Sequence, residues 1–407
     1  MRDTVAQSKP PFHAVGAFEL YAIVSSLSKL GNQIFYVVIP LFVLHLTHSA
    51  FKMGIEGFCQ TFAYILSPWI GQLIDGRDRR ATFVAGQLLK AILLIGLPVC
   101  AAITTVPLWD IYLTTFVVQA IGVMTNTVSD YSILPALIRG GSNERWNAAF
   151  TVAANVGRLI GPVVAGLLIG LIGYLPALYV DAASLMLLMG FVLKRVPVTT
   201  EAVRRGAPRV WDGFRMLWQL RELWRYTLVF ALVNLSVGAL PVVCMYFMRH
   251  RWHLANPTVG LVMTLVSVSG LVGSLVAPRI ATQRPLKTRF GILVAALLIA
   301  GAPVILILRD VTLAGFILTE GAVGAMQVLF TSYRQKAIAN THMGRVNSAI
   351  SLTMMAGVPF ASIAMADLAS TAIAKVVGVF VVACAATALV LVLFRHRTNK
   401  IAESQTG

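Results

Sequence analysis

Long apolar segments, repeated along almost the whole chain, are the feature that most limits the possible folds. They cover residues 14–46, 50–70, 82–104, 108–137, 146–172, 174–194, 225–248, 257–278, 288–308, 311–333, 344–369 and 371–394. A helix needs about 20 apolar residues to cross a bilayer, whereas the strands of a membrane barrel alternate over about ten residues. The sequence therefore predicts an all-α membrane protein with twelve transmembrane helices.

The composition agrees with a membrane location. Hydrophobic residues make up 57% of the chain and charged residues 12%, against about 25% charged residues in a soluble domain. In a soluble protein a net charge of +17 would suggest nucleic-acid binding, but here the basic residues gather in loops and are not interleaved with aromatic residues. The lipid bilayer is therefore the expected partner, and nucleic acid is not.

The basic residues are divided unequally between the two sides of the predicted bundle. Of the 33 Lys and Arg residues, 25 fall on the side that carries both termini, 5 fall on the other side, and Lys29, Lys90 and Arg158 lie inside spans. Because basic loops are retained on the cytosolic side of a membrane, we expect both termini in the cytosol and an even number of spans.

The longest polar break divides the chain into two halves of six spans, which look like a diverged repeat. The predicted units are an N-terminal half (1–194), a cytosolic linker (195–224) and a C-terminal half (225–407). Four apolar residues of the linker share one face of a predicted helix: Trp211, Phe214, Leu217 and Trp218. This pattern indicates an amphipathic helix that lies on the membrane surface.

The loop between the second and third spans reads Gly71-Gln72-Leu73-Ile74-Asp75-Gly76-Arg77-Asp78-Arg79-Arg80. Gly71 permits close approach of helices, Asp75 at a span end needs a partner, and the arginines add cytosolic charge. The loop resembles the pattern Gly-x-Leu-x-Asp-x-x-Gly-Arg-Arg of the major facilitator superfamily. Matching residues are Gly71, Leu73, Asp75, Arg79 and Arg80, while Asp78 stands where the family usually has glycine. A positive-inside turn without a gating role is the alternative.

This resemblance implies two pseudo-symmetric six-helix halves with a substrate site between them near the midplane. It also implies that Asp75, Arg77, Arg79 and Arg80 hold a cytosolic gate closed in the outward-open state. A bacterial inner-membrane location, a functional monomer, a small organic substrate, protons as the coupling ion and no cofactor are the accompanying expectations.

A second motif, in the fifth span, reads Asn155-Val156-Gly157-Arg158-Leu159-Ile160-Gly161-Pro162-Val163-Val164-Ala165-Gly166. Its small residues permit close packing, and its proline bends the helix. The motif resembles the Gly-x-x-x-Gly-Pro-x-x-Gly-Gly element of antiporters in this superfamily. Gly157, Gly161, Pro162 and Gly166 match, and Ala165 replaces one glycine. The resemblance implies proton-driven export, and an ordinary packing face is the alternative.

Three shorter stretches are similar to one exporter branch, which includes macrolide-efflux and enterobactin-exporter type proteins. They are Ser25–Asn32, Leu134–Ile138 followed by Asn147-Ala148, and Gly344–Ser348. Members of that branch often carry an acid where this chain has Asn32. Drug-like compounds, macrolides and siderophores all remain possible substrates.

Ionisable groups inside spans are costly, and they are usually functional. Arg158 and Glu320 should lie near the midplane, and Glu320 is our first choice for the group that binds the coupling proton. Further acidic candidates are Asp181, Glu19 and Asp130. Neutral candidates for the cavity wall are Gln33, Tyr36, Gln119, Asn126, Asn234, Tyr246 and Gln327. For these neutral residues, hydrogen bonding between helices is the alternative.

Other chemistries find little support in the sequence. The four cysteines lack metal-ligand spacing, and four histidines near the predicted outer face are interpreted as interfacial anchors: His45, His48, His250 and His253. No phosphate-binding glycine loop, Ser-His-Asp set or HExxH motif is present, so neither ATP-driven transport nor an enzyme is expected. No metal site is predicted.

The sequence therefore predicts a twelve-helix secondary transporter that exports a drug-like compound or siderophore by proton antiport. A facilitator that imports a siderophore or similar solute is one alternative. A non-transporting membrane receptor or assembly factor is another, although such a protein would not need charges at the midplane.

We predict that Asp75→Asn leaves the protein in the membrane and slows transport severely, because an acid at a span end pairs with cationic or helix-terminal groups in only one of two states. Uptake into inverted vesicles with matched protein levels measures the effect. Transport at the normal rate would leave the loop with a role in topology only.

Overall fold

The structure is a computed structural model that describes residues 12–67, 69–70, 78–129, 133, 143–196, 210–279, 285–301, 308–338, 343–370 and 375–393. All regular elements within these ranges are helices. The first group comprises α1 (Phe12–Thr47), α2 (Ala50–Ile65), α4 (Arg79–Ile103), α5 (Leu108–Val128), α7 (Asn143–Ile172) and α8 (Leu178–Arg195). A short helix, α9 (Val210–Gln219), follows. The second group comprises α10 (Arg221–Val237), α11 (Leu240–Tyr246), the π-helical turn η2 (Phe247–Arg251), α12 (Asn256–Val276), the short η3 (Ala277–Arg279), α13 (Leu286–Gly301), α14 (Arg309–Ala337), α15 (Met343–Met355), α16 (Val358–Ser370) and α17 (Lys375–Leu393).

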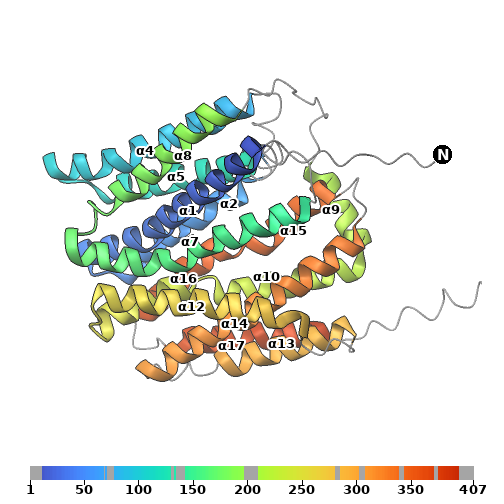
Figure 1. Cartoon of the computed structure of the whole chain (residues 1–407). Coiled ribbons are helices and arrows are strands. Elements are labelled where there is room, and N and C mark those ends of the chain that lie inside the picture. The colour runs from blue at the N-terminus through green and yellow to red at the C-terminus, as the bar shows by residue number, and fades with distance from the viewer. Residues whose placement is uncertain are drawn as a thin grey trace, which may run out of the picture.

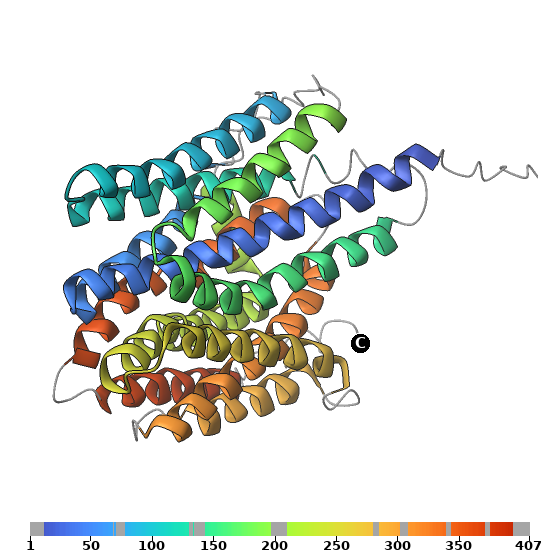
Figure 2. The same cartoon turned by 60° about the vertical axis from the view of Figure 1, so that its left-hand side comes forward.

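The helices form two bundles. Most contacts of α1 to α8 are made within that group, and most contacts of α10 to α17 are made within theirs, while the pairs α2–α16 and α7–α12 join the two groups. In Figure 1 the blue to green helices of the first bundle lie above most of the yellow to red helices of the second, and Figure 2 keeps this separation after rotation. Helix α9 packs against α15 and α10. We call the end of the molecule that carries α9 the α9 end.

The predicted fold class fits this arrangement. Within the described ranges, eight helical segments are long and apolar enough to cross a membrane. The other predicted spans coincide with α2, α8, α13 and α17. Each apolar segment thus contains a helix, while the count of twelve membrane crossings and the boundaries of the halves stay predictions.

The amphipathic linker helix is present as α9. Its Leu217 side chain is fully buried against the second bundle, whereas the Trp211 and Trp218 side chains are 79% and 67% exposed. Exposed tryptophans favour a membrane–water interface, which agrees with the predicted surface position.

Asp78, which departs from the family pattern, begins α4. Its Oδ1 atom accepts hydrogen bonds from the backbone N–H groups of Arg80 (2.9 Å) and Ala81 (3.3 Å). The first N–H groups of a helix have no partner within the helix, so an aspartate at this position stabilises the start of α4. Residues Gly71, Asp75 and Arg77 lie outside the described ranges.

Two spans of the second bundle are interrupted, and their breaks face each other. Helix α10 ends at Gly238 and α15 ends before Gly357. A Cβ atom at Gly238 would lie 2.8 Å from Val358, and one at Gly357 would lie 2.7 Å from Leu235. Discontinuous helices at membrane depth are tolerated where protein or a cavity surrounds them.

The two bundles contact each other at the end opposite α9 through glycines. A Cβ atom at Gly54 of α2 would lie 2.7 Å from the Ala366 side chain of α16, and one at Gly166 of α7 would lie 2.6 Å from the backbone oxygen of Asn256. A Cβ atom at Gly260 of α12 would overlap the backbone oxygen of Pro162. These small residues let the backbones approach closely, so the contact between the bundles depends on them.

We predict that Gly260→Ala separates the bundles at this end, because the backbone of α7 leaves no space for a methyl group. Spin labels at Leu171→Cys and Leu261→Cys, in a background without the native cysteines, should report a longer distance in the variant. Gly190→Ala is the matched control, since a Cβ atom there would meet nothing within 4 Å. An unchanged distance in Gly260→Ala would show that the contact is not controlled by this glycine.

Candidate functional site

A cavity of about 570 Å³ lies between the two bundles. Its wall includes Gln33, Tyr36 and Arg158 from the first bundle and Ser267 and Glu320 from the second. Gly57, Pro162 and Val242 also line it, so the cavity adjoins the glycine contacts between the bundles. Its size is that of a typical small-molecule site.

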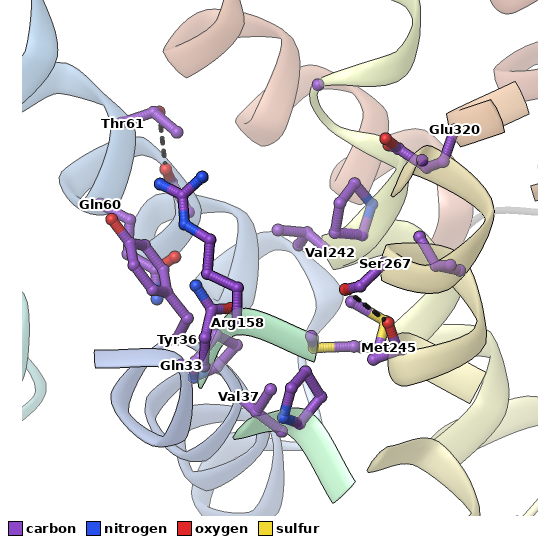
Figure 3. Close-up of a pocket in the computed structure, with 18 of the residues that line it drawn as sticks. Gln33, Tyr36, Val37, Gln60, Thr61, Arg158, Val242, Met245, Ser267 and Glu320 are labelled. Carbon is purple, nitrogen blue, oxygen red and sulfur yellow. Dashed lines mark hydrogen bonds between the residues drawn. The ribbon is translucent and has the colours of Figure 1, made fainter. Parts of the chain in front are cut away.

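Arg158 and Glu320 face this cavity from opposite bundles (Figure 3). On the first side, a Cβ atom at Gly157 would overlap the backbone of Ser26, and one at Gly161 would overlap the Gln33 side chain. The glycine face of α7 therefore packs on α1 and leaves Arg158 on the cavity wall. The predicted pair of midplane charges thus shares one cavity.

Close packing of glycines also positions Glu320 on the second side. A Cβ atom at Gly324 of α14 would overlap the backbone of Gly270 on α12, and one at Gly273 of α12 would overlap that of Gly321. The residue before Gly321 is Glu320, so the contact between these helices holds the carboxyl group beside α12, at the cavity wall.

A smaller polar cavity of about 40 Å³ adjoins the first bundle's wall and shares Gln33, Tyr36 and Arg158 with the larger one. Lys29, Asn32, Lys90, Gln119 and Asn126 also line it. The Lys90 Nζ atom donates a hydrogen bond to Asn32 Oδ1 (2.8 Å), and the Tyr36 hydroxyl donates to Gln119 Oε1 (2.8 Å). Four predicted candidates, Gln33, Tyr36, Gln119 and Asn126, are therefore brought together here.

Asp181 lies behind Lys90 and lines neither cavity. Its side chain on α8 is completely buried beside Gly31 of α1, and neither carboxyl oxygen has a hydrogen-bond partner among the described residues. Asp181 and Lys90 interact electrostatically. The acid therefore serves as a buried counter-charge to the lysine.

Three predicted wall residues lie away from both cavities in this conformation: Asn234, Tyr246 and Gln327. Asn234 donates a hydrogen bond to the Met354 carbonyl (3.2 Å) at the paired helix breaks, and Tyr246 stacks on His250. Gln327 and Glu19 are exposed, and Asp130 lies outside the described ranges. A role for these residues in binding stays a prediction.

Sequence reasoning assigned no role to two buried groups. Lys90 is 2% exposed, and Glu56 of α2 is fully buried with one carboxyl oxygen accepting a hydrogen bond from Gln60 Nε2 (2.7 Å). The other oxygen of Glu56 has no partner among the described residues. Both are ionisable residues inside apolar segments, so the rule that identified Arg158 and Glu320 would have found them.

The four histidines come together at the end opposite α9. They line a cavity of about 320 Å³ with Tyr174 and Arg249, and the histidines are His45, His48, His250 and His253. His45 stacks on Tyr174, with 5.0 Å between ring centroids. Among the described residues, no group of three or more His, Cys, Asp or Glu could hold a metal ion. The histidines therefore line a shared cavity between the bundles.

Two helical bundles, a polar cavity between them and interrupted helices beside it define a membrane transporter fold. A family model described as Major Facilitator Superfamily matches residues 21–363. The chain belongs to the Major Facilitator Superfamily, which confirms the family resemblance and the predicted fold class.

Two curated relatives share about a quarter of their residues with this chain over the matched part. The multidrug efflux pump Tap of Mycolicibacterium fortuitum is 27% identical over 60% of this chain and 62% of its own length. The staphyloferrin A transporter of Staphylococcus aureus is 26% identical over 63% of this chain and 65% of its own length. The matched part thus spans less than two thirds of either relative.

A solved structure supports the fold. The inward-facing crystal structure of a bacterial homologue of the iron transporter ferroportin has a TM-score of 0.73 at 16% identity, covering 93% of this chain and 98% of that chain.

We predict that Lys90→Met and Asp181→Leu each lower thermal stability, because each leaves an unbalanced buried charge. The double variant should recover part of the lost melting temperature in detergent, whereas the exposed Asp310→Asn should change little. Additive losses in the double variant would show that the two groups are not coupled.

Proposed function

We propose that this protein is a secondary transporter that exports a small organic molecule across the bacterial inner membrane in exchange for protons. The observation that carries the proposal is the placement of Arg158 and Glu320 on opposite walls of one cavity between two bundles. A charged group inside a membrane is costly, and such groups mark substrate and proton pathways.

The unequal distribution of basic residues supports a cytosolic location for the α9 end. Described basic residues on that side include Arg80, Lys194, Arg195, Arg215, Arg221 and Lys287. The bundles are held together at the opposite end by the glycine contacts. With the α9 end in the cytosol, the closed end faces outward and the conformation is inward-facing.

Alternating access then requires the glycine contacts to separate while the α9 end closes. Closure of the α9 end is assigned to the loop that contains Asp75 and its neighbouring arginines. Arg80 already donates a hydrogen bond to the backbone oxygen of Leu193 on α8. Arg80 belongs to the first turn of α4, directly after that loop in the sequence.

Export by proton exchange is supported by the glycine-proline motif of α7. Its members Pro162 and Gly166 lie in the contact with α12, through Gly260 and Asn256. The motif resembles an element of antiporters, and here it belongs to the contact that must open. Glu320, on the other bundle, is assigned the coupling proton. The relative described as a multidrug efflux pump agrees with export.

Import by a facilitator of the same fold remains the second candidate. The name of the staphyloferrin A transporter does not say whether that relative imports or exports its substrate. A facilitator would move substrate down its gradient at any pH and would not depend on a carboxyl group in the cavity.

We predict that Glu320→Gln abolishes proton-driven export and retains substrate binding, because glutamine keeps the size of the side chain and cannot exchange a proton. The measurement is accumulation of candidate drugs and siderophores in inverted vesicles energised by a pH gradient. Asp310→Asn, on the same helix and 91% exposed at its side chain, is the matched control.

Accumulation at the wild-type rate in Glu320→Gln would move the proton site to another carboxyl group, with Asp181 and Glu56 as the described candidates. Transport by the wild type only down the substrate gradient, at every pH, would replace the antiport proposal with the facilitator.

A further inference from the structure

We propose that the transported molecule is an organic anion, a carboxylate-bearing compound whose acidic group binds the cationic wall of the first bundle beside Arg158. This inference rests on the proposed transport through the central cavity, and it names the substrate class that the sequence left open. The juxtaposition that supports it is an arginine on one wall of that cavity, beside the neutral polar side chains of Gln33 and Tyr36, with a single described acid on the other wall.

Cations outnumber acids among the described residues that line the two adjoining cavities. The described residues that line them include three cations, Lys29, Lys90 and Arg158, and one acid, Glu320. Asp181 balances Lys90 from behind and lines neither cavity. The first bundle presents Arg158 to the larger cavity, and its described lining residues include no acid.

Arg158 is the group best placed to receive an anion. Its side chain is exposed to the cavity, and the structure shows no hydrogen bond or ion pair between its guanidinium group and another described residue. A guanidinium group offers a planar fork of N–H donors that fits a carboxylate with two parallel hydrogen bonds. An uncompensated cation at this depth is costly, so an anionic ligand would stabilise it.

Neighbouring groups suit the rest of such a ligand. Gln33 and Tyr36 lie beside Arg158 on the same wall (Figure 3) and add neutral polar atoms. Met245 and Val266, from the second bundle, provide apolar surface on the cavity wall. A molecule with an acidic end and an apolar body would thus be oriented with its acid toward α7.

The acids of this region are poorly placed to bind a cationic substrate. Glu56 is fully buried and lines neither cavity. Glu320 is the one lining acid in the described structure, and it lies across the cavity from Arg158. A cation would therefore have a single carboxylate to pair with and would face repulsion from Arg158.

The substrate then binds at Arg158 and the proton binds at Glu320, so the two do not compete for one carboxylate. Exchange instead requires that the protein carries the substrate in one conformational change and the proton in the reverse change. The inside-negative membrane potential would also drive an anion outward.

The histidine-lined cavity at the end opposite α9 also presents hydrogen-bond donors. Arg249, Tyr174 and four histidines line it, and its described lining residues include no carboxylate. Both bundles contribute, through His45 and His48 on one side and His250 and His253 on the other. An anion that leaves the central cavity toward this end would continue to meet hydrogen-bond donors.

The test compares two dyes of similar shape and opposite charge, carboxyfluorescein and rhodamine 6G, by fluorescence anisotropy with the purified full-length protein. We expect the anionic dye to bind the wild type at least tenfold more tightly than the cationic dye, and citrate to displace it. Arg158→Gln should weaken binding of carboxyfluorescein at least tenfold, while Arg158→Lys should retain part of the affinity because it keeps the charge.

Two control variants separate this effect from a general loss of positive charge. Lys52→Gln removes an exposed cation that lines neither cavity, and it should leave both affinities unchanged. Glu320→Gln removes a like charge and should bind carboxyfluorescein at least as tightly as the wild type. The comparison of dyes on the wild type needs no variant, so it stands even where Arg158→Gln does not fold.

The inference is overturned if rhodamine 6G binds more tightly than carboxyfluorescein, if carboxyfluorescein does not bind, or if a folded Arg158→Gln binds it normally. Binding is measured without transport. An anion that binds but never accumulates in energised inverted vesicles would therefore refute the proposed export alone. Proton-driven accumulation of rhodamine 6G without binding of the anion would refute the substrate class alone.

Discussion

The free-energy cost of a charge inside a bilayer is the constraint on which this structure depends. The surroundings of the described ionisable groups at membrane depth reduce that cost in different ways. Lys90 has an acid behind it and an amide oxygen in front of it, Glu56 accepts a hydrogen bond from Gln60, and Arg158 and Glu320 reach the central cavity. Arg158 and Glu320 are the described ionisable residues that line the larger cavity, so the proposed chemistry of transport is assigned to them.

Glycines make this arrangement possible because they set how closely the helices approach. The glycine face of α7 brings that helix onto α1, and the glycine contact between α12 and α14 places Glu320 at the wall. The same kind of contact, between α7 and α12 and between α2 and α16, joins the two bundles at one end. Large side chains also meet there, since the Phe58 ring on α2 lies 5.6 Å from the Phe360 ring on α16 between centroids. In the proposed mechanism this contact separates and re-forms.

Hydropathy alone was sufficient to predict most of the fold. A bilayer permits few solutions for a long apolar segment, so each predicted segment contains a helix, and α9 follows from its amphipathic pattern. Ionisable residues in spans predicted Arg158 and Glu320 by the same reasoning. The position of Asn234 away from the cavity wall could not be predicted in this way, because α10 is interrupted near it and the side chain donates a hydrogen bond to the Met354 carbonyl. A helix break changes which face a residue occupies, and no periodicity in the sequence signals the rotation.

The two bundles share a scaffold while their chemistry differs, and this difference locates the function. His48 and His253, each at the turn after the first span of its half, both adopt a left-handed backbone with φ of 50° and 51°. Non-glycine residues rarely adopt this conformation, so the two turns share an uncommon backbone geometry. The cavity walls show no such correspondence, since cations gather on the first bundle and the lining acid belongs to the second. A symmetric scaffold allows the two bundles to rock about a common axis. The unequal charges support the proposal that the first bundle binds the solute and the second bundle binds the proton.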